Sequence, residues 1–203
     1  MTRVTLDMTI SLDGFVAGPK QSLENPLGAN GDRLHRWMFE AAAENAAEVE
    51  AIVSSGAYIM GRNMFGPIRG EWILGDDDEI DWNGWWGPEP PYHGPVFVLT
   101  NHPRPLLVMK GGTTFTFVTE GIESALTQAI ASSPDGTVSI AGGASIVRQY
   151  LEAGLVDELR LHLAPVLLGS GERLFDGLSI GELEPLTARA TALVTHLAYR
   201  VAP

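Results

Sequence analysis

Two adjacent glycines, Gly142 and Gly143, stand between an apolar run and an amphipathic segment. The run at 137–141 is typical of a buried parallel strand, and residues 144–151 have helical spacing. A glycine pair at such a turn lets a ligand approach the backbone, and it directs the free N–H groups of the new helix toward an anion. The same pair also suits an ordinary tight turn. The pattern therefore predicts either a phosphate-binding turn or a purely structural one.

The bulk composition excludes several classes of function. The formal net charge is −12, which argues against nucleic acid or an anionic membrane as partner, because both require a basic surface. The chain has no cysteine, so disulfides, thiolate metal sites and a cysteine nucleophile are excluded, and no metal site is predicted. Neither a signal-peptide pattern nor a long apolar span is present in the sequence. We expect a cytoplasmic protein that acts on a small molecule.

Two segments organise the N-terminal part of the chain. Residues 3–10 alternate in hydropathy, which predicts a strand with Asp7 and two threonines on its polar side. The segment 32–54 has helical spacing, with Asp32 as N-cap, and predicts one long helix. Its apolar stripe consists of Leu34, Trp37, Met38 and Ala41.

The remaining pattern alternates between strands and helices as far as residue 160, and strands alone follow. We therefore predict an α/β fold in which one mostly parallel sheet has an antiparallel C-terminal edge and helices on both faces. Ligands bind such sheets at the carboxyl ends of the strands. The glycine-containing and basic turns fall at those ends. Strands are predicted at 57–60, 96–99, 115–118, 137–141, 158–168, 185–190 and 193–201, and helices at 122–131 and 144–151.

An aromatic and acidic insert at 67–95 interrupts this order within a single domain that spans 1–203. It contains four of the five tryptophans, five prolines and an acidic run at 76–79. A connection of this length is usually a functional lid, an interface or a flexible insert. The tryptophans predict that part of it packs against the rest of the protein. The acidic run is predicted to be a solvated tip, with metal binding as the lesser alternative.

The order and spacing of the segments resemble the dihydrofolate reductase superfamily. More narrowly, they are similar to the branch that includes the reductase domain of bacterial riboflavin biosynthesis. The resemblance covers nearly the whole chain outside the insert, and it implies a nicotinamide-cofactor reductase. The matching segments are SLDGFVA at 11–17, MGRNMF at 60–65, FVLTN at 97–101, FTFVTEGIESAL at 115–126, IAGGASIVRQYL at 140–151 and LVDELRLHLAPVLLGSGERLF at 155–175.

The resemblance implies a set of cofactor-binding residues. Arg62 would contact the adenosine 2′-phosphate, because a guanidinium matches phosphate oxygens, and its alternative role is a surface salt bridge. Met64 replaces a hydroxyl residue that is frequent in the family, so NADPH is expected and NADH is possible. The turn residues Thr100, Asn101 and His102 would flank the adenine and its ribose. The phosphates would meet Gly61, Arg62, Asn63 and Met64 at one turn and Gly142, Gly143, Ala144, Ser145 and Ile146 at the other.

On the substrate side the resemblance selects Asp13, because the riboflavin branch has the same Asp-Gly near its substrate. Asp13 could bind a substrate hydroxyl or amine or help deliver a proton, or it could cap its own loop. True dihydrofolate reductases have an acid on the first long helix, and no carboxylate stands on that stripe here, which argues against folate reduction. The tryptophan pair of the insert would form a lid or stacking wall. The predicted substrate-binding residues are Phe15, Leu34, Trp37, Met38, Trp85 and Trp86.

We therefore expect an NAD(P)H-dependent reductase that passes hydride to a small planar compound, pteridine-like or pyrimidine-like. One alternative is a nicotinamide-nucleotide-binding protein with little turnover, such as a sensor. Another is a flavin- or deazaflavin-dependent reductase on the same fold. Related reductases pair through the tail strand and the segment 155–175, so a homodimer is expected.

Overall fold

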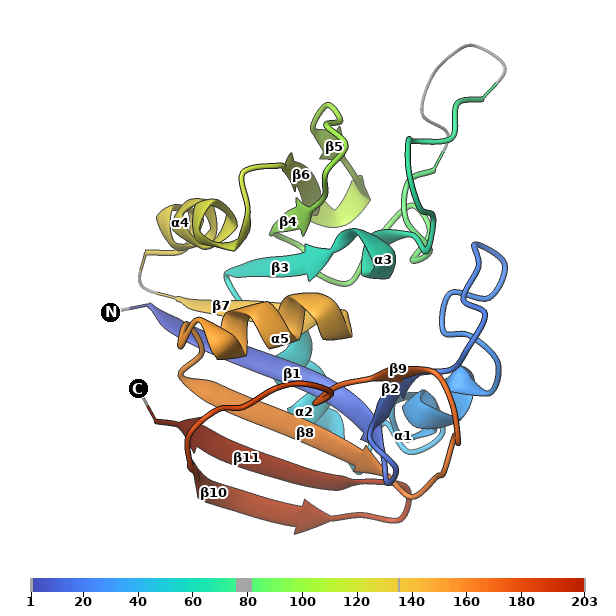
Figure 1. Cartoon of the computed structure of the whole chain (residues 1–203), viewed down its shortest axis with the longest axis vertical. Helices are drawn as coiled ribbons and strands as arrows, with labels where there is room; N and C mark the ends of the chain where they lie inside the picture. Colours follow the sequence, from blue (N-terminus) through green and yellow to red (C-terminus); the bar gives the residue numbers. More distant parts are fainter. Residues whose placement is uncertain (1, 76–81, 135, 203) are drawn as a thin grey trace.

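The computed structural model describes residues 2–75, 82–134 and 136–202 (Figure 1). Within them, nine strands form one sheet in the order β10-β11-β8-β1-β7-β3-β4-β6-β5. The strands of this sheet are β1 (Arg3–Ser11), β3 (Ala57–Gly61), β4 (Pro95–Leu99), β5 (Leu107–Val108), β6 (Thr114–Val118), β7 (Thr137–Gly142), β8 (Glu158–Ala164), β10 (Leu183–Ala190) and β11 (Thr195–Val201). A separate antiparallel pair joins β2 (Phe15–Ala17) to β9 (Glu172–Arg173). The helices are η1 (Gly31–His35), α1 (Arg36–Phe39), α2 (Ala46–Val53), α3 (Arg62–Phe65), η2 (Lys110–Gly112), α4 (Ile122–Ser132) and α5 (Ala144–Glu152).

The six strands from β8 to β6 in this order run parallel, so their carboxyl ends share one edge of the sheet. The β11 and β10 strands are antiparallel at one side, as the sequence predicted. The opposite side also ends in an antiparallel strand, β5, which the sequence did not predict. A strand of two residues is too short to leave a hydropathy pattern.

The first face of the sheet is apolar and packs against α4 and α5. The core there includes Val4, Leu6, Ile59, Ile140 and Leu159, all buried. These residues alternate along their strands with side chains on the second face, as a pleated sheet requires. In Figure 1, α5 crosses in front of β7 and β1 while α2 lies behind the sheet.

The second face has two different covers. Over β3, β4 and β6, the insert packs Trp72 and Tyr92 against Phe65 and Phe115, and all four side chains are buried. Over β1, β8 and β11, the cover is formed by η1, α1 and α2. The insert therefore contributes to the hydrophobic core, as its tryptophans predicted, and its acidic run at 76–79 lies outside the described residues.

The prediction of one long helix over 32–54 was wrong. The structure has η1 and α1 as far as Phe39, a break, and then α2 from Ala46. At the break, the buried Asn45 side chain donates through Nδ2 to the carbonyl of Ala41 at 2.9 Å. Asparagine competes in this way for helical carbonyls and so interrupts helices. Asp32 is also not the N-cap, which is Asn30.

The predicted strand at 158–168 ends earlier, at Ala164. The next residue, Pro165, has no N–H with which to continue a ladder. The helix predicted at 122–131 and the strand at 57–60 are confirmed within one residue.

A gap between two central strands opens at the carboxyl edge. The β1 strand pairs with β7 only from Arg3 to Leu6, whereas it stays paired with β8 as far as Ser11. The strands β1 and β7 therefore separate beyond Leu6. The pairing therefore ends at the edge where parallel sheets bind ligands.

Candidate functional site

Three adjacent strands, β7, β3 and β4, end side by side at the carboxyl edge. Each is followed by one group of predicted cofactor residues. α5 follows β7, α3 follows β3, and a turn that begins at Thr100 follows β4. The structure thus brings together all three groups, which are far apart in the sequence.

The N-terminus of α5 is open to a ligand. Its N-cap, Gly143, makes no side-chain capping hydrogen bond, and a Cβ added there would meet nothing within 4 Å. At Gly61, by contrast, a Cβ would lie 2.7 Å from Cγ1 of Ile146. Glycine at 61 therefore lets the end of β3 approach α5. The N–H groups of Ile146 and Val147 donate to the carbonyl of Gly143 at 3.0 and 3.1 Å, so those of Ala144 and Ser145 are left for an anion.

Arg62, the first residue of α3, is the most distinctive group at this edge. Its guanidinium carbon lies 3.2 Å from the centroid of the Trp72 ring. All three guanidinium nitrogens are buried, and among the described residues none has a hydrogen-bond partner. Burial, and then the nearby charge of Arg104, lower the pKa of Arg62. A buried guanidinium without acceptors is destabilised until an anion supplies them.

A second arginine lies beside the same indole. The guanidinium carbon of Arg104 is 5.1 Å from the Trp72 ring centroid, and its Nη2 donates to Oδ1 of Asn83 at 2.9 Å. Trp72 itself donates through Nε1 to the carbonyl of His102 at 3.0 Å. The insert thus fixes two cations next to the turn that was predicted to flank the adenine ribose.

The tryptophans of the insert also hold α3 in place. Trp82 donates through Nε1 to the carbonyl of Phe65, and Trp85 donates to that of Met64, both at 2.9 Å. These bonds satisfy carbonyls that a short helix leaves free at its C-terminus. The Trp85 ring stacks on Trp86 at 4.9 Å and is 37% exposed. The insert therefore acts on the orientation of Arg62 from both ends of α3.

The other predicted cofactor residues fall around this centre. Thr100 accepts the backbone N–H of His102 at 3.1 Å and so shapes its own turn. Asn63 is exposed and donates to the Gln21 side chain at 3.1 Å. A Cβ at Gly142 would lie 3.3 Å from Sδ of Met64, so Met64 borders the glycine turn. Asn101 and Ser145 are exposed, whereas Ala144 is buried.

The Asp13 carboxylate is held by its own loop and by the loop that follows β8. Its carboxylate accepts hydrogen bonds from Oγ of Ser11 at 2.6 Å, from N of Gly169 at 2.7 Å and from N of Leu168 at 3.1 Å. The Ser11 bond, aided by the two backbone N–H groups, lowers the pKa of Asp13 from 3.8 to about 2. This geometry favours the loop-capping role over proton delivery, because a carboxyl that ionises at such a pH holds no proton near neutrality.

We predict that Asp13→Asn lowers Tm at pH 7 and that the difference from the wild type vanishes near pH 2. Because the folded-state pKa is depressed, the stabilisation is present above the ordinary pKa and is lost as pH falls through the folded value. Thermal unfolding followed by circular dichroism between pH 2 and 7 measures this. Asp176→Asn, which removes an exposed ion pair with Arg173, is the control and should change little. An equal Tm deficit at both ends of the range would contradict the prediction.

The predicted substrate residues separate into two groups. Phe15, Leu34 and Trp37 are buried near β1 and β8, with Met38 half-buried beside them. Trp85 and Trp86 instead belong to the aromatic layer over β3, β4 and β6. Whether either group contacts a substrate stays a prediction.

Sequence reasoning missed a polar cluster on the second face. Asp7, His162 and His196 are buried there, and Trp37 packs on both histidine rings at 4.8 and 5.1 Å. The alternation of the first strand places Asp7 on its polar side but does not tell whether that side is buried. Central parallel strands are covered on both faces, so a carboxylate within such a strand is itself a signal of a buried polar site.

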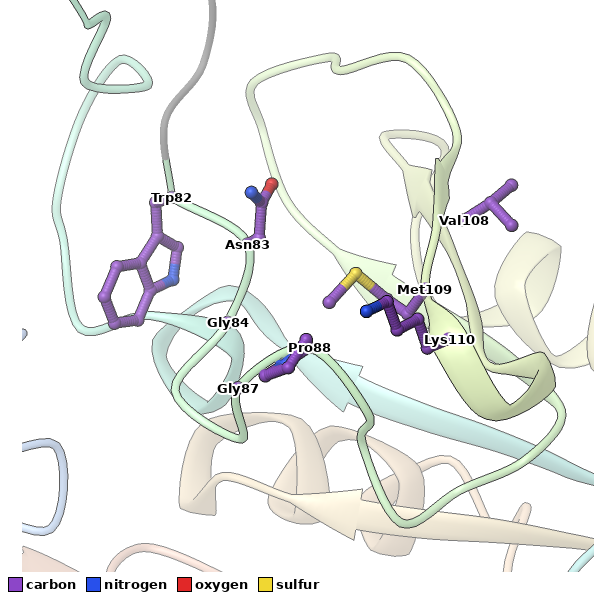
Figure 2. A pocket seen from close by; sticks show the side chains of 8 residues that line it. All are labelled: Trp82, Asn83, Gly84, Gly87, Pro88, Val108, Met109 and Lys110. Atoms are coloured by element: carbon purple, nitrogen blue, oxygen red, sulfur yellow. The ribbon is translucent and has the colours of Figure 1, made fainter.

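A hollow of about 460 Å³ lies between the insert and the β5 segment (Figure 2). Trp82 and Asn83 border it on one side and Met109 and Lys110 on the other. It contains none of the predicted catalytic or cofactor residues.

Metal-binding clusters and membrane-spanning helices are both absent from the part of the chain that the structure describes. Within residues 2–75, 82–134 and 136–202, histidine and carboxylate side chains nowhere gather in threes in a way that could hold a metal ion. None of the helices in these ranges has the length and apolar character needed to cross a bilayer.

Comparison with known proteins identifies the family. Residues 2–197 match the model of the RibD C-terminal domain. The chain belongs to the RibD C-terminal domain family. The resemblance to riboflavin-type reductases and their dihydrofolate-reductase-like fold is thereby confirmed.

Individual relatives of this RibD C-terminal domain have low sequence identity to it. The uncharacterised Bacillus subtilis protein YyaP is 23% identical over 173 residues, which cover 85% of this chain and 80% of YyaP. A candidate riboflavin biosynthesis protein of Shewanella has a TM-score of 0.63 at 20% identity, with both chains fully covered. The Saccharomyces riboflavin biosynthesis reductase Rib7 has a TM-score of 0.58 at 15% identity, covering 100% of this chain and 89% of Rib7. At these identities the structural matches establish the fold.

Proposed function

We propose that this protein is an NADPH-dependent reductase that transfers hydride to a small planar heterocycle, pyrimidine-like or pteridine-like. Membership of the RibD C-terminal domain family supports the reaction type, because solved neighbours include Rib7 and a pyrimidine reductase-like protein of Corynebacterium diphtheriae. The observation that carries the choice of cofactor is the Arg62 guanidinium, which is buried, stacked on Trp72 and without an acceptor among the described residues.

The residues at this edge fit a phosphorylated dinucleotide. Arg62 and Arg104 would hold the 2′-phosphate, and the N–H groups after Gly143 would hold the pyrophosphate. The bound nicotinamide supplies the hydride. The chain would contribute orientation, since the pairing of β1 with β7 ends at Leu6, beside the turn after Gly142 where the cofactor is proposed to bind.

The direct test is NADPH oxidation, followed at 340 nm, with a panel of aminopyrimidines, pteridines and quinones. We expect turnover with at least one nitrogen heterocycle. Binding of NADPH without consumption by any compound would favour a nucleotide-binding sensor. A coloured preparation would favour a flavin-dependent enzyme.

We further propose that the protein forms a homodimer through the tail strands and the segment 155–175. β10 is an edge strand with mostly exposed side chains, and Leu167 nearby is 65% exposed. Light scattering coupled to size exclusion measures the mass. A single species of 21.8 kDa at all concentrations would contradict this proposal.

A further inference from the structure

Two Asn-Gly pairs occur in the sequence, Asn30-Gly31 and Asn83-Gly84. The carbonyl carbon of an asparagine side chain can be attacked by the backbone nitrogen of the next residue. Glycine permits this attack most readily, because no Cβ shields that nitrogen. The attack forms a succinimide ring and releases ammonia, and water then opens the ring to a carboxylate. The tertiary structure places the two pairs in opposite surroundings.

The attacking nitrogen of the second pair, that of Gly84, is accessible. Asn83 is exposed and lies in a part of the insert without regular secondary structure. Its side chain projects from this segment at the rim of the hollow beside β5 (Figure 2). Within the described part of the chain, no backbone carbonyl accepts the N–H of Gly84. This N–H therefore has no backbone hydrogen bond to give up before the nitrogen attacks.

Arg104 both fixes the side-chain amide of Asn83 and polarises it. Its Nη2 donates to Oδ1 of Asn83 at 2.9 Å, and its Nη1 donates to the carbonyl of Trp82, the residue before. A cationic donor on a carbonyl oxygen stabilises the negative charge that develops there when a nucleophile attacks the carbon. Because one guanidinium makes both contacts, the amide is also held relative to its own backbone. This environment favours the attack.

The first pair, in contrast, lies in a closed turn. The N–H of Gly31 donates to the carbonyl of Gly28 at 3.1 Å, and Gly31 is buried. A Cβ added at Gly31 would lie 3.0 Å from Cβ of Leu27, so the turn is closely packed. Attack by the Gly31 nitrogen requires this hydrogen bond to break and the turn to move. The fold therefore protects Asn30.

We propose that Asn83 is a site of spontaneous deamidation, and that the carboxylate formed there pairs with Arg104 and weakens the binding of a phosphorylated nucleotide. A bond forms between Cγ of Asn83 and the nitrogen of Gly84, and ammonia leaves. One water then opens the ring on either side, which gives aspartate or its isomer. The consequence for binding follows from position, because the guanidinium carbons of Arg62 and Arg104 lie 3.2 and 5.1 Å from the Trp72 ring centroid. The new charge neutralises one of these two cations, and only this consequence rests on the proposed function.

The first test compares the two asparagines within the full chain. The protein is incubated at mildly alkaline pH, where the attacking amide loses its proton more readily, and peptide mapping by mass spectrometry follows the gain of about 1 Da at each site. We expect Asn83 to convert at least about tenfold faster than Asn30, because Gly31 must first give up its hydrogen bond. In concentrated urea, where neither environment persists, the two rates should become similar.

Three outcomes would overturn the proposed site. These are an Asn83 that stays unmodified, an Asn30 that converts as fast or faster, and a rate ratio that persists unchanged in urea. The last of these would show that the neighbouring sequence, and not the fold, sets the rates.

The consequence for binding is measured with Asn83→Asp, which installs the product directly. Calorimetric titration should show NADPH binding about threefold weaker than in the wild type and NADH binding unchanged, because a partly screened charge has a small effect. Asn83→Gln, which keeps a neutral amide, should bind both nucleotides as the wild type does. Equal losses in the two variants, or unchanged NADPH affinity in Asn83→Asp, would refute the effect of charge. A wild type that binds no NADPH would refute the proposed reductase, whereas conversion at Asn83 would still be decided by mass.

Discussion

Replacing Arg62 by alanine should weaken NADPH binding by about 30-fold and leave NADH binding within about 3-fold of the wild type. The guanidinium is held over Trp72 at 3.2 Å, and among the described residues its nitrogens have no acceptors. A 2′-phosphate would supply those acceptors, and NADH has none to offer at that position. Comparing NADPH with NADH therefore separates the loss of a 2′-phosphate contact from a general loss of affinity for the dinucleotide. Isothermal titration with each nucleotide measures the ratio.

The control for this change is Arg69→Ala. Arg69 is exposed and lies on the insert, seven residues along the chain from Arg62. Arg69→Ala removes the same formal charge from the same region and leaves the stack of Arg62 on Trp72 in place. If Arg62→Ala and Arg69→Ala weaken NADPH equally, long-range attraction explains the effect and the 2′-phosphate contact is refuted.

Trp72→Ala should lower the free energy of unfolding by about 3–5 kcal/mol, as expected when a buried tryptophan is truncated in a packed core. Trp72 is 7% exposed and packs edge-on against Phe65 and Phe117, with ring centroids 5.9 and 5.1 Å away. The same change removes the surface on which Arg62 is stacked. Urea denaturation, followed by far-ultraviolet circular dichroism, gives the unfolding free energy directly.

Trp85→Ala is the matched comparison, because Trp85 belongs to the same insert but is 37% exposed. We expect it to cost less than about 1 kcal/mol. Comparable losses in the two variants would mean that the insert unfolds as one unit, with no distinction between core and surface tryptophans. A stable Trp72→Ala protein would show that the insert is a detachable lid.

Local sequence patterns were sufficient for most of the sheet. The run before Gly142 and the alternation at 3–10 each specify a strand, because strand periodicity and turn residues act over a few positions. The order of the segments then determined the parallel arrangement and placed the three cofactor turns at one edge. The prediction of one helix over 32–54 was wrong because one residue, held by a contact distant in the sequence, interrupts it. Asn45 breaks it while bonding to His196, which lies 151 residues further along the chain.

The candidate site likewise combines residues that the sequence reveals with contacts that only the structure reveals. The glycine pair could be selected from the sequence because glycines at a strand end are a local feature, and Arg62 was selected through the resemblance to the reductase family. The Trp72 stack on Arg62 could not, since it depends on how an irregular insert returns to the sheet. Asp7, too, was visible only as a polar residue on an alternating strand. Its burial follows from the helical cover over β1, and its nearest cationic groups, Arg160 and His162, stand on β8.

The sequence by itself thus determined the α/β class, the parallel sheet and the edge at which the predicted cofactor residues meet, because these depend on periodicity and on the order of segments. Tertiary structure alone decided which charged groups are buried and which of them lack partners. Burial and hydrogen-bond satisfaction depend on contacts between residues distant in sequence, and no local pattern records them.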